Sequence, residues 1–251
     1  MVRVLFVAIG GDDTLGVARR LHQDFGTQVV GCPKTIDNDL SATDTTFGYD
    51  TAVSIATEAI DRLRTTAKSH ERIIVVEIMG RHAGWITYGA GVAGAANVTL
   101  IPEVEPDLDE MTSIFKKRAE NGEKWGIVAV SEGVTFSEDF VTQNAEKDEF
   151  GHVRLGGVAE GLAGELKERT GIDTRHVVLG HLQRGGTPTA YDRILSTRYG
   201  LRAAEAVKNG EWGKMVALRG NEIVTVDLSE ATEETKTVPD DLYGAARTFF
   251  G

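Results

Sequence analysis

The sequence predicts an α/β fold with a mainly parallel sheet, and three observations lead to this prediction. Apolar runs of strand length alternate with helical patterns along most of the chain, which is the order expected of repeated βα units. The first apolar run, residues 2–9, is broken only by Arg3, as expected of a parallel strand that is buried on both faces. Charged residues gather directly after the apolar runs, where open parallel sheets have their ligand crevice.

The first half of the chain contains four predicted strands with helices between them. The second strand is expected to end at Pro33, because proline has no amide N–H for the ladder. Apolar side chains at helical spacing predict the longest helix of this half. The predicted elements are strand 2–9, helix 15–25, strand 28–32, helix 49–63, strand 73–79, helix 84–96 and strand 99–101.

The second half continues the alternation and ends its helices with glycine. Asp107 and Glu110 have the pattern of an N-cap with a capping box, and Gly122 is placed to end that helix. Gly220-Asn221 separates two short apolar runs and predicts a hairpin. The polar residues 135–152 are expected to form a mobile loop. The other predicted elements are strand 125–130, helix 158–170, strand 175–182, helix 191–208, strands 215–219 and 222–226, and helix 240–250.

Composition excludes several classes of function. The chain has 251 residues, 41% of them hydrophobic, which suffices for one large domain or two small ones. No apolar stretch approaches the roughly 20 residues of a membrane span. The formal net charge of −11 argues against nucleic acid and anionic membranes as partners. A single cysteine, Cys32, excludes an internal disulfide and favours a reducing, cytoplasmic location.

Residues 33–39, Pro-Lys-Thr-Ile-Asp-Asn-Asp, give the strongest indication of chemistry. Asp37 and Asp39 are two residues apart, so they point the same way if the segment is extended. Like charges on one side repel unless a cation or proton relieves them, and Lys34 adds a positive group. A carboxylate near a cation is a suitable base for a hydroxyl proton during phosphoryl transfer. The structural alternative, an Asx turn at Asn38, explains neither Asp37 nor Lys34.

Four further strand ends carry polar groups. Residues 10–14, Gly-Gly-Asp-Asp-Thr, open a helix whose N–H groups could meet an anion, although a glycine turn with an N-cap is the structural alternative. Arg81 follows a strand and suits a phosphate, whereas a surface cation is the alternative. Glu132 and His181 could bind sugar oxygens, or be a loop carboxylate and a core histidine. Because carboxyl ends of parallel strands form one crevice, we expect these ends to share a site.

Together these residues resemble the phosphofructokinase family, in order and spacing, over nearly the whole chain. The matching motifs are Gly-Gly-Asp-Asp-Thr at 10–14, Pro-Lys-Thr-Ile-Asp-Asn-Asp at 33–39, Met-Gly-Arg at 79–81, Ser-Glu-Gly at 131–133 and Gly-His-Leu-Gln-Arg-Gly-Gly at 180–186. The resemblance implies two Rossmann-like lobes with mainly parallel sheets. Residues 1–48 with about 185–212 would form a partial donor-binding lobe, and 49–184 with 213–251 a lobe that binds fructose 6-phosphate.

The resemblance also implies a reaction and roles for individual residues. The family transfers a phosphoryl group to the 1-hydroxyl of fructose 6-phosphate in glycolysis, using Mg²⁺. Asp37 would be the base, with Lys34 and Thr35 at the transferred phosphate, and Asp12 and Asp39 would serve the metal. The implied donor-binding residues are Gly11, Asp12, Asp13 and Thr14. The implied substrate-binding residues are Met79, Gly80, Arg81, Glu132, His181 and Arg184, together with Arg72 and Arg175, which would reach a neighbouring subunit's site in a homo-oligomer.

Asp13 and Lys34 bear on the phosphate donor. ATP-dependent bacterial members of the family typically have glycine at both positions, whereas aspartate with lysine is typical of the pyrophosphate-dependent members. A carboxylate at position 13 would repel the α-phosphate of a nucleotide, and Lys34 could offset the charge of pyrophosphate. The resemblance therefore favours a reversible, pyrophosphate-dependent enzyme, with an ATP-dependent 6-phosphofructokinase as the alternative.

The opening of the chain departs from the family pattern. The family begins with a strand and a glycine loop that cradles the donor phosphates, whereas this chain starts at the strand before Gly10. We therefore expect a shortened donor-binding lobe whose sheet edge is exposed or is covered by another chain. This departure keeps a third interpretation open, namely a catalytically impaired subunit that binds a sugar phosphate or regulates another protein.

Overall fold

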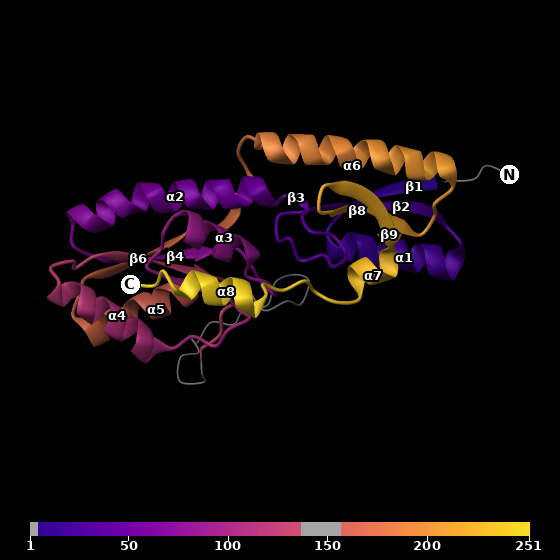
Figure 1. The fold of residues 1–251 in the computed structure, drawn as a ribbon. Helices are drawn as coiled ribbons and strands as arrows, with labels where there is room; N and C mark the ends of the chain where they lie inside the picture. Colours follow the sequence, from indigo (N-terminus) through magenta and orange to yellow (C-terminus); the bar gives the residue numbers. More distant parts are fainter. Residues whose placement is uncertain (1–4, 137–156) are drawn as a thin grey trace. The chain divides into compact units, whose positions relative to one another are not determined.

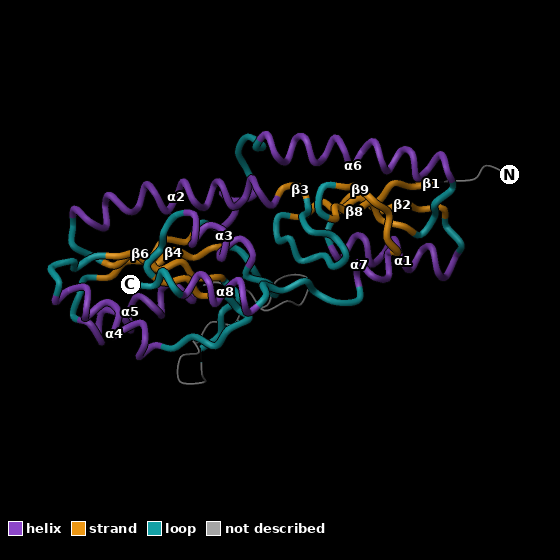
Figure 2. Tube along the Cα trace, viewed as in Figure 1, coloured by secondary structure: helices purple, strands orange, loops and turns teal. Residues whose placement is uncertain are grey.

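The computed structural model describes residues 5–136 and 157–251, so most of the loop expected at 135–152 lies outside the described residues. The chain divides into two compact units, Met1–Ala52 with Thr187–Lys236 and Val53–Gly186 with Thr237–Gly251. Each unit has a mainly parallel sheet with helices on both faces (Figures 1 and 2). The predicted α/β class is therefore confirmed.

The first unit is built on a five-stranded sheet. Its strands are β1 (Leu5–Gly10), β2 (Gln28–Thr35), β3 (Phe47–Gly48), β8 (Lys214–Arg219) and β9 (Glu222–Asp227). The sheet order is β1-β2-β8-β9, with the short β3 paired to β2. β1, β3 and β8 run parallel to β2, whereas β9 is antiparallel to β8 and forms the predicted hairpin.

Helices cover both faces of this first sheet. They are α1 (Asp12–Phe25), α6 (Ala190–Asn209), α7 (Leu228–Thr232) and the first residues of α2 (Tyr49–Ser69). α6 packs on one face through Leu195 and Tyr199. α1 and α7 pack on the other face through Leu15 and Leu228 (Figure 1). The apolar core of the unit therefore forms two layers, one on each side of the sheet.

Residues 213–236 belong to the first unit, although the sequence analysis assigned them to the second. β8 joins the first sheet because Val30 and Gly31 of β2 are in register with Lys214 and Met215. α7 then packs on the same sheet, so closely that a Cβ on Gly31 would lie 2.8 Å from Leu228. This pairing joins segments about 180 residues apart in sequence, and local patterns do not show it.

β1 is an exposed edge strand, so the prediction that it is buried on both faces is wrong. Its apolar side chains Leu5, Phe6 and Ile9 are 47%, 50% and 58% exposed. Among the described strands, β1 pairs only with β2. An apolar run is compatible with a central or an edge strand, and only the pairing pattern distinguishes the two.

The second unit has a four-stranded sheet that is parallel throughout. Its strands are β4 (Ile73–Ile78), β5 (Val98–Leu100), β6 (Gly126–Ser131) and β7 (Thr174–Val178), in the order β5-β6-β4-β7. β7 ends before the predicted residue 182, and a 3₁₀ turn, η2 (Gly180–Arg184), follows it. Gly180 has a φ of 49°, which a strand does not accommodate.

Helices cover both faces of the second sheet as well. They are most of α2, with α3 (Trp85–Ala93), α4 (Leu108–Glu120), α5 (Val158–Thr170) and α8 (Asp240–Arg247). α4 and α5 bury Phe115 and Leu162 against one face, and α2 and α3 cover the other (Figure 1). No helix among the described residues combines the length and apolar character that crossing a membrane requires.

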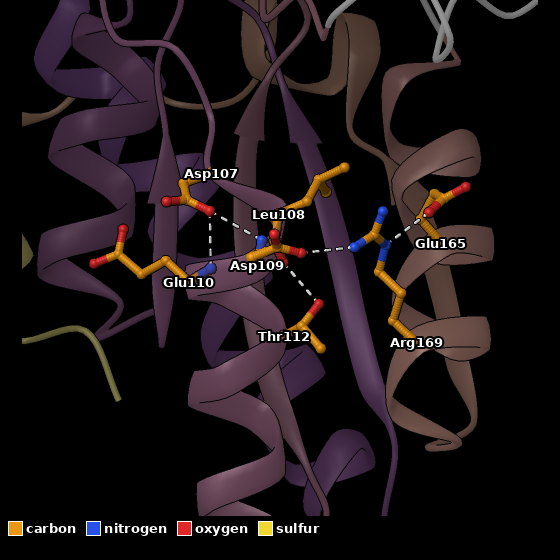
Figure 3. Close-up of polar contacts among 7 residues, drawn as sticks. All are labelled: Asp107, Leu108, Asp109, Glu110, Thr112, Glu165 and Arg169. Carbon is orange, nitrogen blue, oxygen red and sulfur yellow. Dashed lines mark hydrogen bonds and ion pairs between the residues drawn. The ribbon is translucent and has the colours of Figure 1, made fainter.

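Polar contacts at the start of α4 confirm the predicted N-cap (Figure 3). A carboxylate oxygen of Asp107 accepts hydrogen bonds from the backbone N–H groups of Asp109 and Glu110, both at 2.9 Å. The carboxylate of Glu110, which was expected to complete a capping box, accepts two hydrogen bonds from Arg247 of α8. Arg169 of α5 bonds Asp109 at 2.9 Å, which links α5 to the start of α4.

Candidate active site

In the first unit, the carboxyl ends of β1 and β2 lie beside each other and carry two of the predicted motifs. β1 ends at Gly10 and β2 at Thr35. A Cβ on Gly11 would lie 3.3 Å from the Cβ of Thr35, so glycine allows the start of α1 to approach the end of β2. A Cβ on Gly10 would collide with Thr14 at 2.5 Å. Asp12 and Asp13, in the exposed first turn of α1, therefore lie near the segment that follows β2.

β2 continues through Pro33, beyond the predicted end of the strand. Pro33 is in register with Gly10 of β1, and Lys34 and Thr35 pair with β3. A proline removes only one donor from the ladder, and pairing on both sides maintains the strand. Lys34 is exposed and Thr35 is buried, so only the lysine of this pair is available to a ligand in solution.

Asp37 and Asp39 lie on a turn, so the extended segment assumed in the sequence analysis is wrong. The residue between them, Asn38, is buried and has a φ of 54°, a left-handed conformation that asparagine tolerates better than most residues. Oδ1 of Asn38 accepts hydrogen bonds from the backbone N–H of Thr46 at 3.1 Å and from Nζ of Lys236 at 3.0 Å. The two aspartates therefore flank a residue whose side chain is bound on two sides.

Thr35 orients the carboxylate of Asp37. Its hydroxyl donates a hydrogen bond to Oδ2 of Asp37 at 3.3 Å and accepts one from the backbone N–H of Asp37 at 3.1 Å. The hydroxyl of Thr46 donates to the carbonyl oxygen of Thr35 at 2.8 Å. Thr35, which was predicted to lie at the transferred phosphate, is buried and serves as the local support of Asp37.

Asp39 has the electrostatic environment of a cation ligand. Burial raises the pKa of Asp39 to about 6, and the negative charges of Asp37 and Asp12 act in the same direction. Its Oδ1 is buried and has no hydrogen-bond partner among the described residues. A divalent cation would offset the repulsion between these carboxylates and would give Oδ1 of Asp39 a partner.

The residues present fit Mg²⁺ rather than a metal held by the protein alone. In the described part of the chain, no three His, Cys, Asp or Glu side chains are grouped closely enough to hold a metal ion. Mg²⁺ usually binds one or two carboxylates and completes its octahedral shell with phosphate oxygens and waters. Asp12 and Asp39 therefore suit a metal that is bound together with a phosphate.

In the second unit, the loops that follow β4 and β6 are bonded to each other. The hydroxyl of Ser131 donates to the carbonyl oxygen of Gly80 at 2.7 Å, and the backbone N–H of Gly133 donates to the same oxygen at 3.1 Å. The backbone N–H of Gly80 donates to the carboxylate of Glu132 at 3.3 Å. A Cβ on Gly133 would lie 2.1 Å from the carbonyl oxygen of Arg81, so only glycine fits there.

Gln183 joins the turn after β7 to these loops. Its Oε1 accepts a hydrogen bond from the backbone N–H of Met79 at 3.2 Å, and its Nε2 donates to the carbonyl oxygen of Gly180 at 3.2 Å. Gln183 is buried, whereas His181 and Arg184 on the same turn are exposed. The second unit therefore presents Glu132, His181 and Arg184, with Met79, Gly80 and Arg81, on three adjoining loops.

Arg72 and Arg175 lie apart from these loops. Arg72 precedes β4 and Met79 follows it, and a six-residue strand spans roughly 20 Å at about 3.3 Å per residue. Both arginines face Asp173, at 3.6 Å from Arg72 and 3.4 Å from Arg175. Their predicted role in a neighbouring subunit's site stays a prediction.

Sequence reasoning did not assign a role to three residues that support these loops. Gln183 lies within the Gly-His-Leu-Gln-Arg motif, and its placement between two glycine-rich turns was the available signal. Thr46 and Lys236 lie in segments without a motif. Lys236 is 198 residues from the asparagine that it bonds, so only the folded structure reveals it.

Comparisons with known proteins identify the family of the chain. The phosphofructokinase family model matches residues 4–207. The chain belongs to the phosphofructokinase family. It is 60% identical over 248 residues to a pyrophosphate–fructose 6-phosphate 1-phosphotransferase of Amycolatopsis mediterranei, covering 98% of this chain and 72% of that relative. It is 51% identical over 243 residues to ATP-dependent 6-phosphofructokinase 3 of Streptomyces coelicolor, covering 96% of this chain and 70% of that relative.

A solved phosphofructokinase structure shares the fold. The pyrophosphate-dependent phosphofructokinase of Marinobacter aquaeolei aligns with a TM-score of 0.77 at 25% sequence identity. The alignment covers 98% of this chain and 67% of that one. The predicted phosphofructokinase fold is therefore confirmed.

Proposed function

We propose that this phosphofructokinase transfers a phosphoryl group to the 1-hydroxyl of fructose 6-phosphate, giving fructose 1,6-bisphosphate in glycolysis. The observation that carries the proposal is the turn of Asp37 and Asp39, where Asp39 has an unpartnered buried oxygen and Asp37 a carboxylate oriented by Thr35. A structural turn needs neither feature. A phosphoryl-transfer site needs both, one for the metal and one for the proton.

Asp37 is assigned as the general base. The 1-hydroxyl oxygen attacks the transferred phosphorus, its proton passes to the carboxylate of Asp37, and the bond from phosphorus to the leaving phosphate breaks. Thr35 holds Asp37 through one hydrogen bond to its carboxylate and one from its backbone N–H, which together favour one orientation of the carboxylate. Lys34, exposed at the end of β2, supplies a positive charge toward the phosphoryl oxygens.

Asp12 and Asp39 are assigned to Mg²⁺, and Gly11, Asp13 and Thr14 to the donor. When bound, Mg²⁺ neutralises charge on the transferring phosphate and orients it. The start of α1 has no side-chain cap, so its N–H groups are suited to phosphate oxygens.

The three adjoining loops of the second unit are assigned to the sugar phosphate. Arg81 and Arg184 suit its phosphate, because a guanidinium binds phosphate oxygens in pairs. Glu132 and His181 suit the sugar hydroxyls, with Met79 and Gly80 lining the same loops. Arg72 and Arg175, which share Asp173 at the other end of the sheet, are proposed to act on a neighbouring subunit of a homo-oligomer.

Pyrophosphate is the favoured donor, and ATP is the second candidate. The higher identity, 60%, is to a relative named for pyrophosphate, but a relative named for ATP is still 51% identical. Asp13 and Lys34 favour pyrophosphate, since a carboxylate in the first turn of α1 would repel a nucleotide's α-phosphate.

Initial rates of the purified chain with each donor test this proposal. We expect fructose 1,6-bisphosphate to form with pyrophosphate faster than with ATP, and the reverse reaction to proceed with phosphate. The double variant Asp13→Gly/Lys34→Gly should shift the ratio of kcat/KM toward ATP by about tenfold or more, the effect of roughly 1.4 kcal/mol. An unchanged ratio would overturn the donor assignment. Fructose 6-phosphate binding without turnover by either donor would instead favour a binding or regulatory subunit.

A further inference from the structure

We propose that Lys236 is a positioning residue of this phosphofructokinase, which sets the turn of Asp37 and Asp39 by tying Asn38 to an anchored segment of the first unit. The inference rests on the proposed function, because it acts through the base and the metal ligand assigned above. The contacts that carry it lie wholly within the first unit.

The ammonium of Lys236 has a partner for each of its three protons. Nζ donates to Oδ1 of Asn38 at 3.0 Å, to the carbonyl oxygen of Thr43 at 2.9 Å and to the carbonyl oxygen of Asp44 at 3.0 Å. Lysine has three donors and no acceptor, so these contacts use its full capacity. An exposed surface lysine gains little from such an arrangement, because immobilising its long side chain costs entropy.

The main chain of Lys236 is fixed as well. Its backbone N–H donates to the carbonyl oxygen of Asp39 at 2.8 Å, and Thr235 forms an isolated antiparallel bridge with Leu40. The residue therefore contacts the turn twice, through its side chain at Asn38 and through its backbone at Asp39. Movement of Lys236 would therefore displace Asn38 and Asp39, of which Asp39 is the proposed metal ligand.

Thr43 and Asp44, which accept two of the ammonium's hydrogen bonds, are themselves bonded to the sheet. The backbone N–H of Asp44 donates to the carbonyl oxygen of Leu218 in β8 at 2.8 Å. The hydroxyl of Thr43 accepts a hydrogen bond from the backbone N–H of Leu218 at 3.0 Å. β8, an inner strand of the sheet, thus holds residues 43–44 in place. Through its bonds to these residues, Lys236 restrains Asn38.

Asn38 needs such a restraint because its backbone is in a left-handed conformation. Asparagine adopts this conformation at some cost, and the surrounding contacts must compensate. Removing the ammonium takes this donor from Oδ1 of the buried Asn38 and from the carbonyl oxygens of Thr43 and Asp44, and the turn is expected to relax toward another backbone geometry. A displacement of about 1 Å at a reacting group is enough to lower a rate about a hundredfold.

The test compares Lys236→Met, which keeps the apolar stem, with Lys214→Met. Lys214 is a matched control because it lies in the same unit and pairs with Asp227 at 2.7 Å on the hairpin, away from the turn. We expect Lys236→Met to lower kcat about ten- to hundredfold while KM for fructose 6-phosphate changes less than about twofold, and to raise the Mg²⁺ concentration needed for half-maximal rate. Lys214→Met should match the wild type.

A second readout does not depend on turnover. With pyrophosphate present, the Mg²⁺ concentration that half-saturates thermal stabilisation should rise in Lys236→Met, and amide hydrogen exchange across residues 38–46 should accelerate without either ligand. If the wild type lacks turnover, the proposed function fails while this readout still tests Lys236.

Should Lys236→Met not fold, Asn38→Gly removes the acceptor but keeps the backbone conformation accessible, and it should lower kcat with KM retained. Wild-type kcat, Mg²⁺ response and exchange in the folded variant would overturn the proposal.

Discussion

The loop after β2 in the first unit and the loops after β4 and β6 in the second are both firmly held, but by different contacts. The first is rich in carboxylates, and side chains such as Thr35 and Asn38 bind its turn. The second is held by the side chains of Ser131 and Gln183, which bond backbone groups, and by glycines that no other residue can replace, as at Gly133. The two sets of loops therefore differ in charge and in how closely their backbones approach, and this difference fits the roles proposed for them.

The largest effect is expected from Asp37→Asn, which removes the base but keeps the size of the side chain. General-base catalysis contributes about 10²- to 10⁴-fold, so kcat should fall by that factor. Asp37 is only partly buried, so circular dichroism should show an intact fold. Asp24→Asn, on the exposed side of α1, is the matched control. Equal kcat values for the two variants would contradict the role of Asp37.

Gly133→Ala is expected to damage the second unit instead. Its Cβ would lie 2.1 Å from the carbonyl oxygen of Arg81, which forces the loops after β4 and β6 apart. We expect a loss of stability of about 1–3 kcal/mol and a higher KM for fructose 6-phosphate. Gly164→Ala is the control, because nothing lies within 4 Å of a Cβ there and α5 should gain up to about 1 kcal/mol. A wild-type KM in Gly133→Ala would contradict the account.

Asp39→Asn should change how stability depends on pH. The pKa of Asp39 is raised from 3.8 to about 6 in the folded protein, so the folded state binds more protons than the unfolded state between these values. Stability therefore falls as pH rises through this window and stays lower above it. Without Mg²⁺, Asp39→Asn should be more stable than the wild type at about pH 8, on the order of 1 kcal/mol.

Urea unfolding at about pH 4 and about pH 8, with EDTA or Mg²⁺, measures this difference. The advantage of Asp39→Asn should shrink at the lower pH, where the wild-type carboxyl is protonated in the folded state and partly protonated in the unfolded state. With pyrophosphate present, Mg²⁺ should stabilise the wild type at the higher pH and have little effect on the variant. A difference that is independent of both pH and Mg²⁺ would rule out Asp39 as the metal ligand.

The smallest effects are expected at the start of α4, which carries none of the residues assigned to the site. Asp107→Ala removes two hydrogen bonds to backbone N–H groups and should cost about 1 kcal/mol of stability with kcat and KM unchanged. Arg169→Ala breaks exposed contacts with Glu165 and Asp109 (Figure 3). The free energy of unfolding should therefore stay within experimental error of the wild type. A change in kcat or KM in either variant would contradict the account, because it assigns no part of the reaction to the start of α4.

Local patterns in the sequence were sufficient for the βα alternation, the β8–β9 hairpin and the cap of α4. These features depend on residues close together in the chain, such as Gly220-Asn221 and Asp107. The exposure of the β1 side chains and the place of β8 depend on pairing between distant strands. No periodicity of one segment contains that information, so both were predicted wrongly.

The candidate site shows the same limit. Asp37, Asp39 and Glu132 were predicted as site residues because each follows an apolar strand. Their supports were not found, because the contacts of Gln183 and Lys236 span 104 and 198 residues. The expectations at Pro33 and Asn38 were also wrong. Tertiary contacts keep Pro33 within a strand. They hold Asn38 in a left-handed conformation, so that the segment is not extended.

Calorimetric titration of fructose 6-phosphate into Asp37→Asn and Gly133→Ala, alongside turnover with pyrophosphate, tests the central claim most directly. The claim is that the first unit supplies the transfer chemistry and the second unit holds the sugar phosphate. The account predicts that Asp37→Asn binds fructose 6-phosphate with a Kd within about twofold of the wild type while its turnover falls at least about a hundredfold. Gly133→Ala should lose affinity for the same ligand. Loss of binding in Asp37→Asn, or wild-type binding in Gly133→Ala, would contradict it.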